Sequence, residues 1–246
     1  MVSSSLKNNN EVFTVPTQWI PRDFQWHNYV DIWSRIPMTT YLRNSLFLSL
    51  VITFLQVLTG SFAAYGFSKV RWRGRDALFV AYIATIAVPW QAYMVPQYVM
   101  LQKAGLVNTF WGIVLPSMFG SPYAIFLLRE YFRTIPTDLI RAARMDGAST
   151  LDVIVHVVLP ASRPILVTLA LITAVSQWNN FMWPLVITSG RTWQVLTVAT
   201  AGLQSRYDAQ WTLVMAATTV AIVPLIVLFV AFGRHIVGSI VVAGLK

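Results

Sequence analysis

The chain has 246 residues, of which 56% are hydrophobic and only 11% are charged, and its formal net charge is +9. A soluble domain normally carries about 25% charged residues, so this composition excludes an ordinary soluble protein and predicts an integral membrane protein. The absence of cysteine excludes disulfides and thiolate metal sites.

The chain begins with a polar segment, residues 1–41, that contains several prolines and tryptophans and has no signal-peptide pattern. Five apolar segments follow, each long enough to cross a bilayer, which takes roughly 20 helical residues. They lie at about Ser45–Phe67, Ala77–Met100, Phe110–Leu128, Ile165–Ile187 and Trp211–Phe232. Their continuous apolar runs favour helices over a barrel. The sequence therefore predicts an all-α, polytopic membrane helical bundle over residues 42–246.

Prolines interrupt these apolar segments, at positions 89, 96, 116, 122, 184 and 224. A proline inside a helix removes one backbone hydrogen bond, which neighbouring helices of a membrane bundle can compensate. We therefore expect kinks within the spans, although proline is also commoner in membrane helices in general.

Basic residues indicate the orientation of the connecting loops. Residues 69–75 hold four basic side chains in seven positions, and residues 129–163 hold five arginines. Because positive residues stay on the cytoplasmic side, both loops and the C-terminus are predicted inside, in contact with anionic lipid headgroups. No basic face is interleaved with exposed aromatic residues, so nucleic-acid binding is a poor explanation of the charge.

This orientation places residues 1–41 outside as an external N-terminal segment. Export of a polar segment of that size without a signal peptide is awkward. We therefore expect a further membrane helix to precede Met1 in the natural gene product.

The loop at residues 129–163 is polar and helix-forming. Thr137 is expected to cap a short helix that runs to Met145, and Gly147 is expected to end it, because glycine enters the left-handed region without a Cβ penalty. Ser149 then opens a second helix, with Asp152 completing a pattern like a capping box. An amphipathic connector lying at the headgroups is the plain alternative.

The spacing within this loop is more specific than its helices. Arg141-Ala142-Ala143 precedes Gly147 by four residues, and Val157-Val158-Leu159-Pro160 closes the pattern. It resembles the cytoplasmic loop with the Glu-Ala-Ala motif of ABC-importer permeases, which couples the permease to its ATPase. The resemblance implies a type I ABC-importer transmembrane domain. It also implies coupling roles for the following residues: Asp138, Arg141, Ala142, Ala143, Asp146, Gly147, Leu159 and Pro160.

One motif residue departs from that family. Arg141 stands where the family usually has a glutamate that pairs with a basic residue of the ATPase. Asp138, one turn earlier, either takes over that contact or pairs with Arg141 at i, i+3. Asp146 matches the family pattern and would suit the turn by accepting bonds from local backbone amides.

The resemblance extends over essentially the whole chain. Gln177-Trp-Asn-Asn-Phe-Met-Trp-Pro184 is similar to a segment of carbohydrate-type permeases of the maltose-importer group, in particular the smaller permease subunit. Aromatic faces pack on sugar C–H groups and amides match hydroxyls, whereas tryptophan and asparagine also anchor and bind helices in membranes. The candidate pathway residues are Trp178, Asn179, Asn180 and Trp183, with Gln91 and Tyr93 as a weaker set.

No catalytic or metal site is expected in this chain. The three histidines are scattered, no pair has metal-ligand spacing, and no nucleotide-binding loop occurs. ATP and Mg²⁺ are therefore expected on separate ATPase subunits. The sequence does not name the solute.

The resemblance implies a permease subunit in the cell inner membrane that imports a sugar or oligosaccharide delivered by an external solute-binding protein. Its partners would be a second permease and two ABC ATPase subunits. A permease for a polyol or a glycerol-phosphate ester is the alternative within transport. A multi-pass membrane enzyme would need an intramembrane His, Asp or Glu or a cluster of nucleophiles, and none of the nine acids lies deep in a span. A scaffold subunit without transport fits the loop spacing less well.

Overall fold

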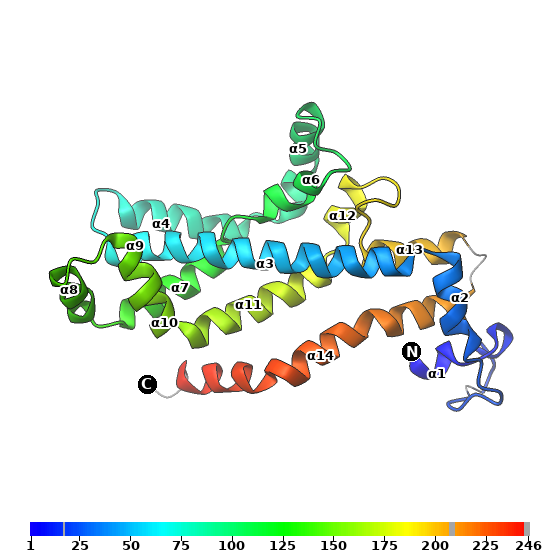
Figure 1. The fold of residues 1–246 in the computed structure, drawn as a ribbon. Coiled ribbons are helices and arrows are strands. Elements are labelled where there is room, and N and C mark those ends of the chain that lie inside the picture. Colours follow the sequence, from blue (N-terminus) through cyan, green and yellow to red (C-terminus); the bar gives the residue numbers. More distant parts are fainter. Residues whose placement is uncertain (17, 207–209, 244–246) are drawn as a thin grey trace. The chain divides into compact units, whose positions relative to one another are not determined.

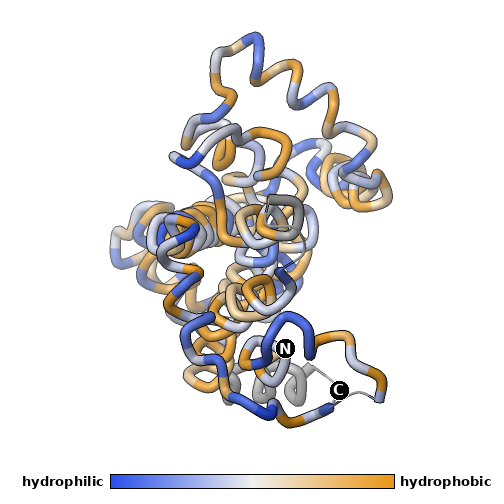
Figure 2. Tube along the Cα trace, turned by 90° about the vertical axis from the view of Figure 1, so that its right-hand side faces the viewer, coloured by the Kyte–Doolittle hydropathy of each residue, from blue (hydrophilic) through white to orange (hydrophobic). Residues whose placement is uncertain are grey.

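A computed structural model describes residues 1–16, 18–206 and 210–243, and every regular element in this part of the chain is a helix (Figure 1). Figure 2 shows apolar residues along the helices and hydrophilic stretches in several of the connecting segments. The all-α prediction is confirmed.

Among the described residues, two helices are long and apolar enough to cross a membrane without a break. They are α3 (Met38–Lys69) and the Trp211–Phe232 part of α14 (Trp211–Ala243). Three further spans appear only if each of three bent helix pairs counts as one. The five predicted spans are therefore the upper count.

The first bent pair joins α4 (Arg75–Ala84) and the short η2 (Thr85–Ala87) to α5 (Trp90–Lys103) through a turn of 99°. The second joins α6 (Phe110–Val114) and η3 (Leu115–Ser117) to α7 (Pro122–Thr134) at 45°. Prolines lie at both breaks. Pro89 precedes α5 with extended backbone, and Pro122 is the first residue of α7, where its missing N–H costs nothing.

The fourth predicted span, Ile165–Ile187, was wrong as a single helix. α11 ends at Trp178 after 16 residues, and α12 (Met182–Ile187) is a separate short helix, so Ile165–Ile187 is not one continuous helix. Asparagines 179 and 180 stand at the break, and their side chains compete with helical backbone hydrogen bonds. α11 (Arg163–Trp178) instead follows the helical segment Thr150–Ala161 at an angle of 82°.

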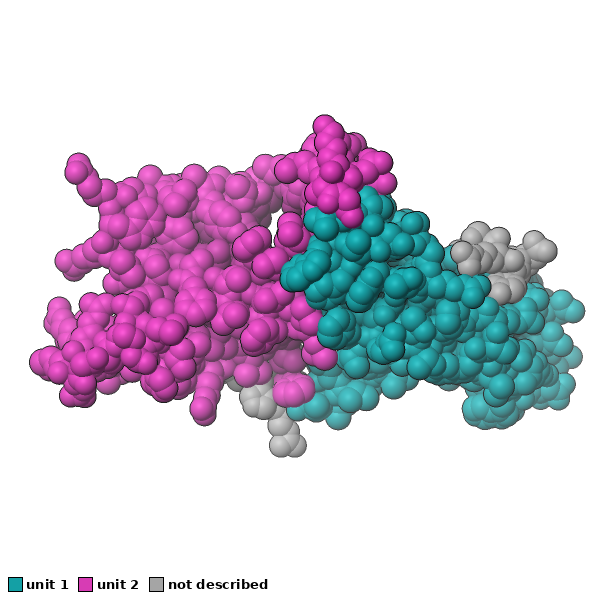
Figure 3. All heavy atoms as spheres, turned by 45° about the horizontal axis from the view of Figure 1, so that its top comes forward, with its two compact units in different colours: residues 1–48, 106–113, 178–231 teal, residues 49–105, 114–177, 232–246 magenta. Residues whose placement is uncertain are grey.

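The chain divides into two compact units, coloured in Figure 3. Unit 1 consists of Met1–Leu48, Leu106–Ile113 and Trp178–Ala231, and unit 2 consists of Ser49–Gly105, Val114–Gln177 and Phe232–Lys246. Unit 1 includes residues on both sides of the predicted boundary between an external segment, residues 1–41, and a membrane domain, residues 42–246. That boundary stays a prediction.

Unit 1 packs around the start of α3. Its core includes Ile32 of α2 (His27–Arg35), Met38 of α3, Leu196 and Leu203 of α13 (Leu196–Arg206), and Ala216 of α14. Asn44 of α3 donates through its amide to the carbonyl oxygens of Thr192 and Gln194, at 2.9 and 3.0 Å. The N-terminal residues contribute two short helices to this unit, α1 (Val2–Ser5) and η1 (Asn9–Glu11).

Unit 2 has a core that positions the loop at residues 129–163. It brings together Ala64 and Tyr65 of α3, Leu128 and Phe132 of α7, and Leu169 of α11. The loop adds buried side chains to the same core, namely Ile140, Val153, Ile154 and Val158. Burial of each such side chain stabilises by roughly 1.5–3 kcal/mol, so the loop is a packed part of unit 2.

Candidate functional site: the coupling loop and the predicted pathway residues

The first loop helix, α8 (Thr137–Met145), ends in a defined turn at Gly147. Gly147 has a φ of +87°, and its N–H donates to Arg144 O at 3.1 Å while the Ala148 N–H donates to Ala143 O at 3.0 Å. These two bonds form a Schellman motif, in which glycine supplies the left-handed residue. The predicted helix stop at Gly147 is confirmed. The predicted cap is wrong: Thr137 is the first helical residue, and Pro136 occupies the cap position without a side-chain bond.

The second loop helix, α9 (Thr150–Asp152), begins with the predicted capping box. The Ser149 hydroxyl oxygen accepts from Asp152 N at 3.2 Å, and the Asp152 carboxylate accepts from Ser149 N at 3.0 Å. Hydrogen bonds from the Ser149 hydroxyl and amide hold the pKa of the Asp152 carboxyl below its usual value. The entry angle of α9 is thus set by residues of the loop itself.

The helix then widens, a feature that the sequence did not predict. Val153–Val158 form a π-helix, followed by α10 (Leu159–Ala161). Pro160 lacks the N–H that would bond the His156 carbonyl in an α-helix, and the i to i+5 pattern ends just before it. His156 is exposed, with its ring Nδ1 3.2 Å from Asp152 O.

The loop has a packed face and an open face. Ile140, Val153, Ile154 and Val158 face the unit 2 core, whereas Leu139, Met145 and Leu151 are 52%, 82% and 58% exposed. Figure 1 shows α8, α9 and α10 grouped at the end of α3 that leads into α4. Three apolar side chains in solvent beside charged Asp138 and Arg141 form a surface suited to a protein partner.

The motif residues are mostly on or near that open face. Ala142, Asp146, Gly147 and Pro160 are exposed, and Ala143 and Leu159 are half-buried. In the described part of the chain, the Asp146 carboxylate accepts no hydrogen bond, and backbone bonds close the turn instead. The expected contact of Asp146 with local amides is therefore not formed.

Arg141 and Asp138 form the i, i+3 ion pair that the sequence allowed, with Nη1 3.1 Å from Oδ1. Their side chains are 75% and 86% exposed. Exposed pairs of this kind contribute little to stability, about 0–1 kcal/mol, because water screens the charges. Breaking this ion pair therefore costs little free energy, so both side chains are available to pair with charged groups of a partner protein.

A buried arginine holds the base of the loop, which sequence reasoning counted only as an orientation signal. Arg129 is 9% exposed and donates to Phe67 O at 3.3 Å and to Asp76 at 3.3 Å. It also pairs with Glu130 at 2.7 Å, and its guanidinium lies 4.0 Å from the ring centre of Phe79. Arg129 therefore joins α3, α4 and α7. The nearby acids Asp76 and Glu130 were the only sequence signal of such a network.

The two predicted pathway tryptophans are buried in unit 1. Trp178 is 7% exposed and donates from Nε1 to Ala221 O at 3.2 Å, next to the carbonyl that Pro224 leaves without its helical partner. Trp183 is 5% exposed and donates to Gly112 O at 3.3 Å. Both contacts are those of helix anchors.

The polar members of the predicted pathway are more open. Asn179 is exposed and Asn180 is half-buried, with its backbone carbonyl accepting from the Thr197 hydroxyl at 2.9 Å. Gln91 and Tyr93 are exposed on α5 and belong to unit 2. Lining of a transport pathway by these residues stays a prediction. Within the described residues, no group of three or more His, Cys, Asp or Glu side chains could hold a metal ion.

The comparison with known families decides what this membrane bundle is. The family described as "Binding-protein-dependent transport system inner membrane component" matches residues 56–241, well over half of the chain. The chain belongs to this family. This permease is therefore a transport subunit of an ABC transporter, in which ATP hydrolysis takes place on a separate subunit.

Individual relatives agree with that assignment. The permease is 30% identical over 207 residues to the arabinooligosaccharides transport system permease protein AraQ of Halalkalibacterium halodurans, covering 84% of this chain and 74% of that one. It is 31% identical over 245 residues to the sn-glycerol-3-phosphate transport system permease protein UgpE of Pectobacterium atrosepticum, covering 95% and 86%.

A solved structure shows the same fold. The permease aligns with a chain of a bacterial ABC transporter involved in the import of the acidic polysaccharide alginate, with a TM-score of 0.81 and 24% identity. The alignment covers 95% of this chain and 87% of that chain. The all-α ABC-importer fold expected from the motif is confirmed.

Proposed function

We propose that this permease imports a sugar or oligosaccharide that an external solute-binding protein delivers. Residues 177–184 combine aromatic and amide side chains near the break between α11 and α12, and the AraQ relative is named for arabinooligosaccharide transport. Amides hydrogen-bond sugar hydroxyls, and Asn179 is exposed at this break. The family's dependence on a binding protein supports delivery from outside.

We further propose that the loop at residues 129–163 binds an ATPase subunit through its open face, and the exposure of that face is the observation that supports this. A second permease subunit and two ABC ATPase subunits complete the assembly, and ATP and Mg²⁺ bind to those ATPases. Leu139, Met145 and Leu151 offer apolar contact area to an ATPase groove, while Asp138 and Arg141 offer charges. Closure of the ATPases on ATP then moves α8 and the π-helix Val153–Val158, which the unit 2 core links to α3, α7 and α11.

The orientation follows from the basic loops. In this proposal the permease lies in the inner membrane with residues 69–75, residues 129–163 and the C-terminus in the cytoplasm. The loop then faces ATP, and residues 1–41 face the binding protein.

The docking test exploits the absence of cysteine from the natural sequence. Met145→Cys places one thiol on the open face, and Lys103→Cys places one at an exposed position of α5 as a control. A short bismaleimide should cross-link the first variant, and not the second, to the ATPase in purified complexes. Cross-linking of neither variant, in complexes that assemble and transport, would refute docking through α8.

The transport test uses the complete complex in proteoliposomes, with the ATPase subunits and ATP both inside the vesicles. Uptake of labelled arabinooligosaccharides, lactose, raffinose and glycerol 3-phosphate is measured with the cognate binding protein outside. ATP-dependent uptake of a saccharide supports the proposal, and uptake of none of the saccharides contradicts it.

A glycerol-phosphate ester is the second candidate substrate, because the identity to UgpE is 31% over 95% of this chain. An anionic ester would be expected to meet a cation in its binding site. Uptake of glycerol 3-phosphate alone in the same assay would favour this candidate.

A further inference from the structure

The short connection between α3 and α4 carries four basic residues with two different fates. Lys69 donates from Nζ to Ile135 O, and Arg75 pairs with Asp76 at 3.0 Å and donates to Val70 O at 3.3 Å. In the described part of the chain, Arg71 and Arg73 have no hydrogen-bond or ion-pair partner, and both are exposed. The connection thus presents two uncompensated positive charges in three residues.

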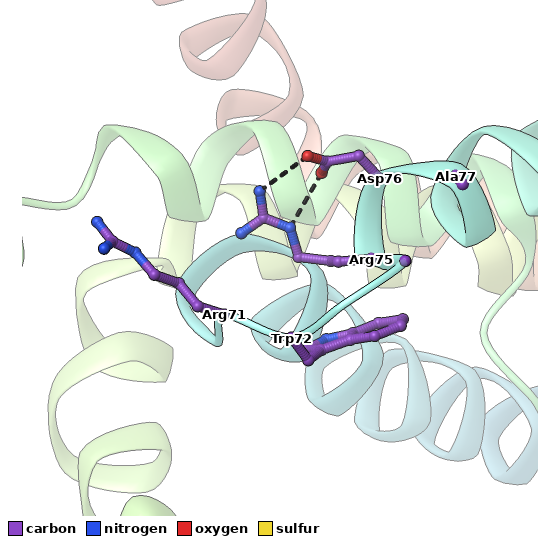
Figure 4. A pocket seen from close by; sticks show the side chains of 6 residues that line it. Arg71, Trp72, Arg75, Asp76 and Ala77 are labelled. Carbon is purple, nitrogen blue, oxygen red and sulfur yellow. Dashed lines mark hydrogen bonds and ion pairs between the residues drawn. The ribbon is translucent and has the colours of Figure 1, made fainter.

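One of these charges, that of Arg71, lies at an open pocket. It has a volume of about 400 Å³ and is lined by Arg71, Trp72, Gly74, Arg75, Asp76 and Ala77. Figure 4 shows the Arg75 guanidinium turned to the Asp76 carboxylate, while the Arg71 side chain extends away from that pair. The carboxylate at the pocket is compensated, because Arg75 and Arg129 both pair with it, at 3.0 and 3.3 Å. The pocket is therefore net positive.

The pocket lies where the chain enters and leaves an apolar layer. α3 ends at Lys69 after a 32-residue apolar helix, and the next candidate span begins at Arg75. Trp72 is 42% exposed, with its ring centre 6.0 Å from that of Phe67 at the end of α3. A half-exposed tryptophan at the end of a membrane helix is typical of the level of lipid headgroups.

We propose that this pocket binds the phosphate group of an anionic phospholipid. Arg71 is its ligand, the exposed Arg73 two residues along the chain adds positive charge, and Trp72 lies against the glycerol and upper acyl chains. Arginine donates two parallel hydrogen bonds to phosphate oxygens, which exposed and unpaired guanidinium groups are free to make. A basic segment beside a membrane helix attracts anionic lipid in the same way. A lipid is favoured over a soluble anion because the tryptophan and the two helix ends place the pocket at the membrane surface. The proposal is independent of the transported solute.

The test uses the purified permease in its full complex, delipidated in detergent and titrated with dioctanoyl phosphatidylglycerol. Native mass spectrometry counts the bound lipid, and dioctanoyl phosphatidylcholine is the zwitterionic comparison. The variant Arg71→Gln/Arg73→Gln removes both charges with little change in side-chain length. Arg191→Gln is the matched control, because Arg191 is exposed on another loop and has no partner among the described residues.

We expect one phosphatidylglycerol to bind the natural complex more tightly than phosphatidylcholine. Its affinity should fall about 25-fold in the double variant, because each basic residue contributes roughly fivefold and the two factors multiply, and it should stay unchanged in Arg191→Gln. Equal retention of phosphatidylglycerol in the double variant and the natural complex would overturn the proposal. Displacement of the lipid by millimolar inorganic phosphate would assign the pocket to a free anion. Loss of the ATPase subunits from the double variant, without loss of lipid, would assign the arginines to a protein contact.

Discussion

Lys69 and Ile135 join the end of α3 to the base of the loop at residues 129–163. The Lys69 ammonium donates to the Ile135 carbonyl oxygen at 2.7 Å, two residues before α8 begins. α7 ends at Thr134, so no backbone N–H of a following helical turn is in place to donate to the Ile135 carbonyl oxygen. A direct hydrogen bond therefore connects α3 to the residue two positions before α8, in addition to the packing of α3 and α8 in the unit 2 core.

Replacing Lys69 with methionine should loosen this connection. Methionine keeps the apolar stem and removes the donor, at a cost of about 1 kcal/mol for a partly exposed hydrogen bond. We expect assembly to persist and the number of ATP molecules hydrolysed per solute transported to rise. Lys103→Met, at an exposed lysine of the same unit, is the control. An unchanged ATP-to-solute ratio in Lys69→Met would show that the bond does not contribute to coupling.

The effect of a substitution at Gly147 should depend on backbone conformation and not on steric contact with other residues. A Cβ at position 147 would meet no atom within 4 Å, but the φ of +87° disfavours any L-residue and most strongly a β-branched one. Gly147→Val should cost on the order of 1–2 kcal/mol and weaken ATPase association, measured by pull-down and by stimulated ATPase activity. Gly147→Asn should be milder, because asparagine enters the left-handed region more readily.

Gly66→Ala provides the control for this series. Gly66 also has open space around its missing Cβ but lies in α3 with ordinary helical φ. Alanine should be neutral or slightly stabilising there. Equal behaviour of Gly147→Val and Gly66→Ala would argue against a special role of the turn.

The charges on α8 give a separate prediction. Because the Asp138–Arg141 pair is exposed, breaking it should change thermal stability by less than about 1 kcal/mol. Arg141→Glu should nevertheless impair coupling when Arg141 meets an acid on the ATPase, and a charge-reversed ATPase should restore it. When Asp138 makes that contact, Asp138→Lys should be the damaging change. Normal transport by both variants would exclude a charge contact at this helix.

The turn and the helix cap within the loop at residues 129–163 were predictable from sequence. Gly147, Ser149 and Asp152 act on neighbours within five residues, so their turn and cap follow from residue type and spacing. The π-helix at Val153–Val158 was not predicted, because Pro160 marks the end of a helix without fixing its hydrogen-bond pattern, and three residues of the π-helix contact distant parts of the unit 2 core. Thr137 was misplaced by one position, which is the usual uncertainty of a helix end.

The features that depend on distant residues were missed. Arg129 bonds Asp76, which is 53 residues away, and its burial arises only when α4 and α7 pack together. Prolines marked the breaks in the spans, but the angles of 99°, 45° and 82° follow from packing around them. Trp178 was predicted in the pathway for its residue type, while its position beside Ala221 decides its contact.

Substitutions of Trp178 and Asn180, at the break between α11 and α12, should therefore have different effects. Trp178→Phe removes the donor to Ala221 O and should lower the stability of the complex by about 1 kcal/mol, with half-saturation for solute unchanged. Asn180→Ala should raise the half-saturating concentration if amides line the pathway. Thermal unfolding and uptake kinetics on the same preparation separate the two effects. A change in solute affinity without loss of stability in Trp178→Phe would return the indole to the pathway.

Gly60 and Gly120 make the sharpest packing prediction, because the contact is asymmetric. A Cβ at Gly120 would overlap Gly60 Cα and come within 2.8 Å of its N, whereas a Cβ at Gly60 would reach Gly120 Cα at an ordinary 3.5 Å. The segment at Gly120 has no easy way to retreat. Tyr82 donates to Gly120 O at 2.6 Å, and Gln56 and Thr59 of α3 donate to Ser117 O and Met118 O at 2.6 and 3.1 Å.

Gly120→Ala should therefore cost about 1–3 kcal/mol through overpacking, whereas Gly60→Ala should be neutral or stabilising. Gly60 lies inside α3, where alanine has the higher helix propensity, by about 1 kcal/mol. The two variants differ from the natural chain by the same single methyl group, so a difference in unfolding temperature between them isolates its position. Equal stability of both would mean that α3 and the segment before α7 are farther apart in the assembled transporter. Destabilisation by Gly60→Ala alone would place the tight contact on the opposite backbone.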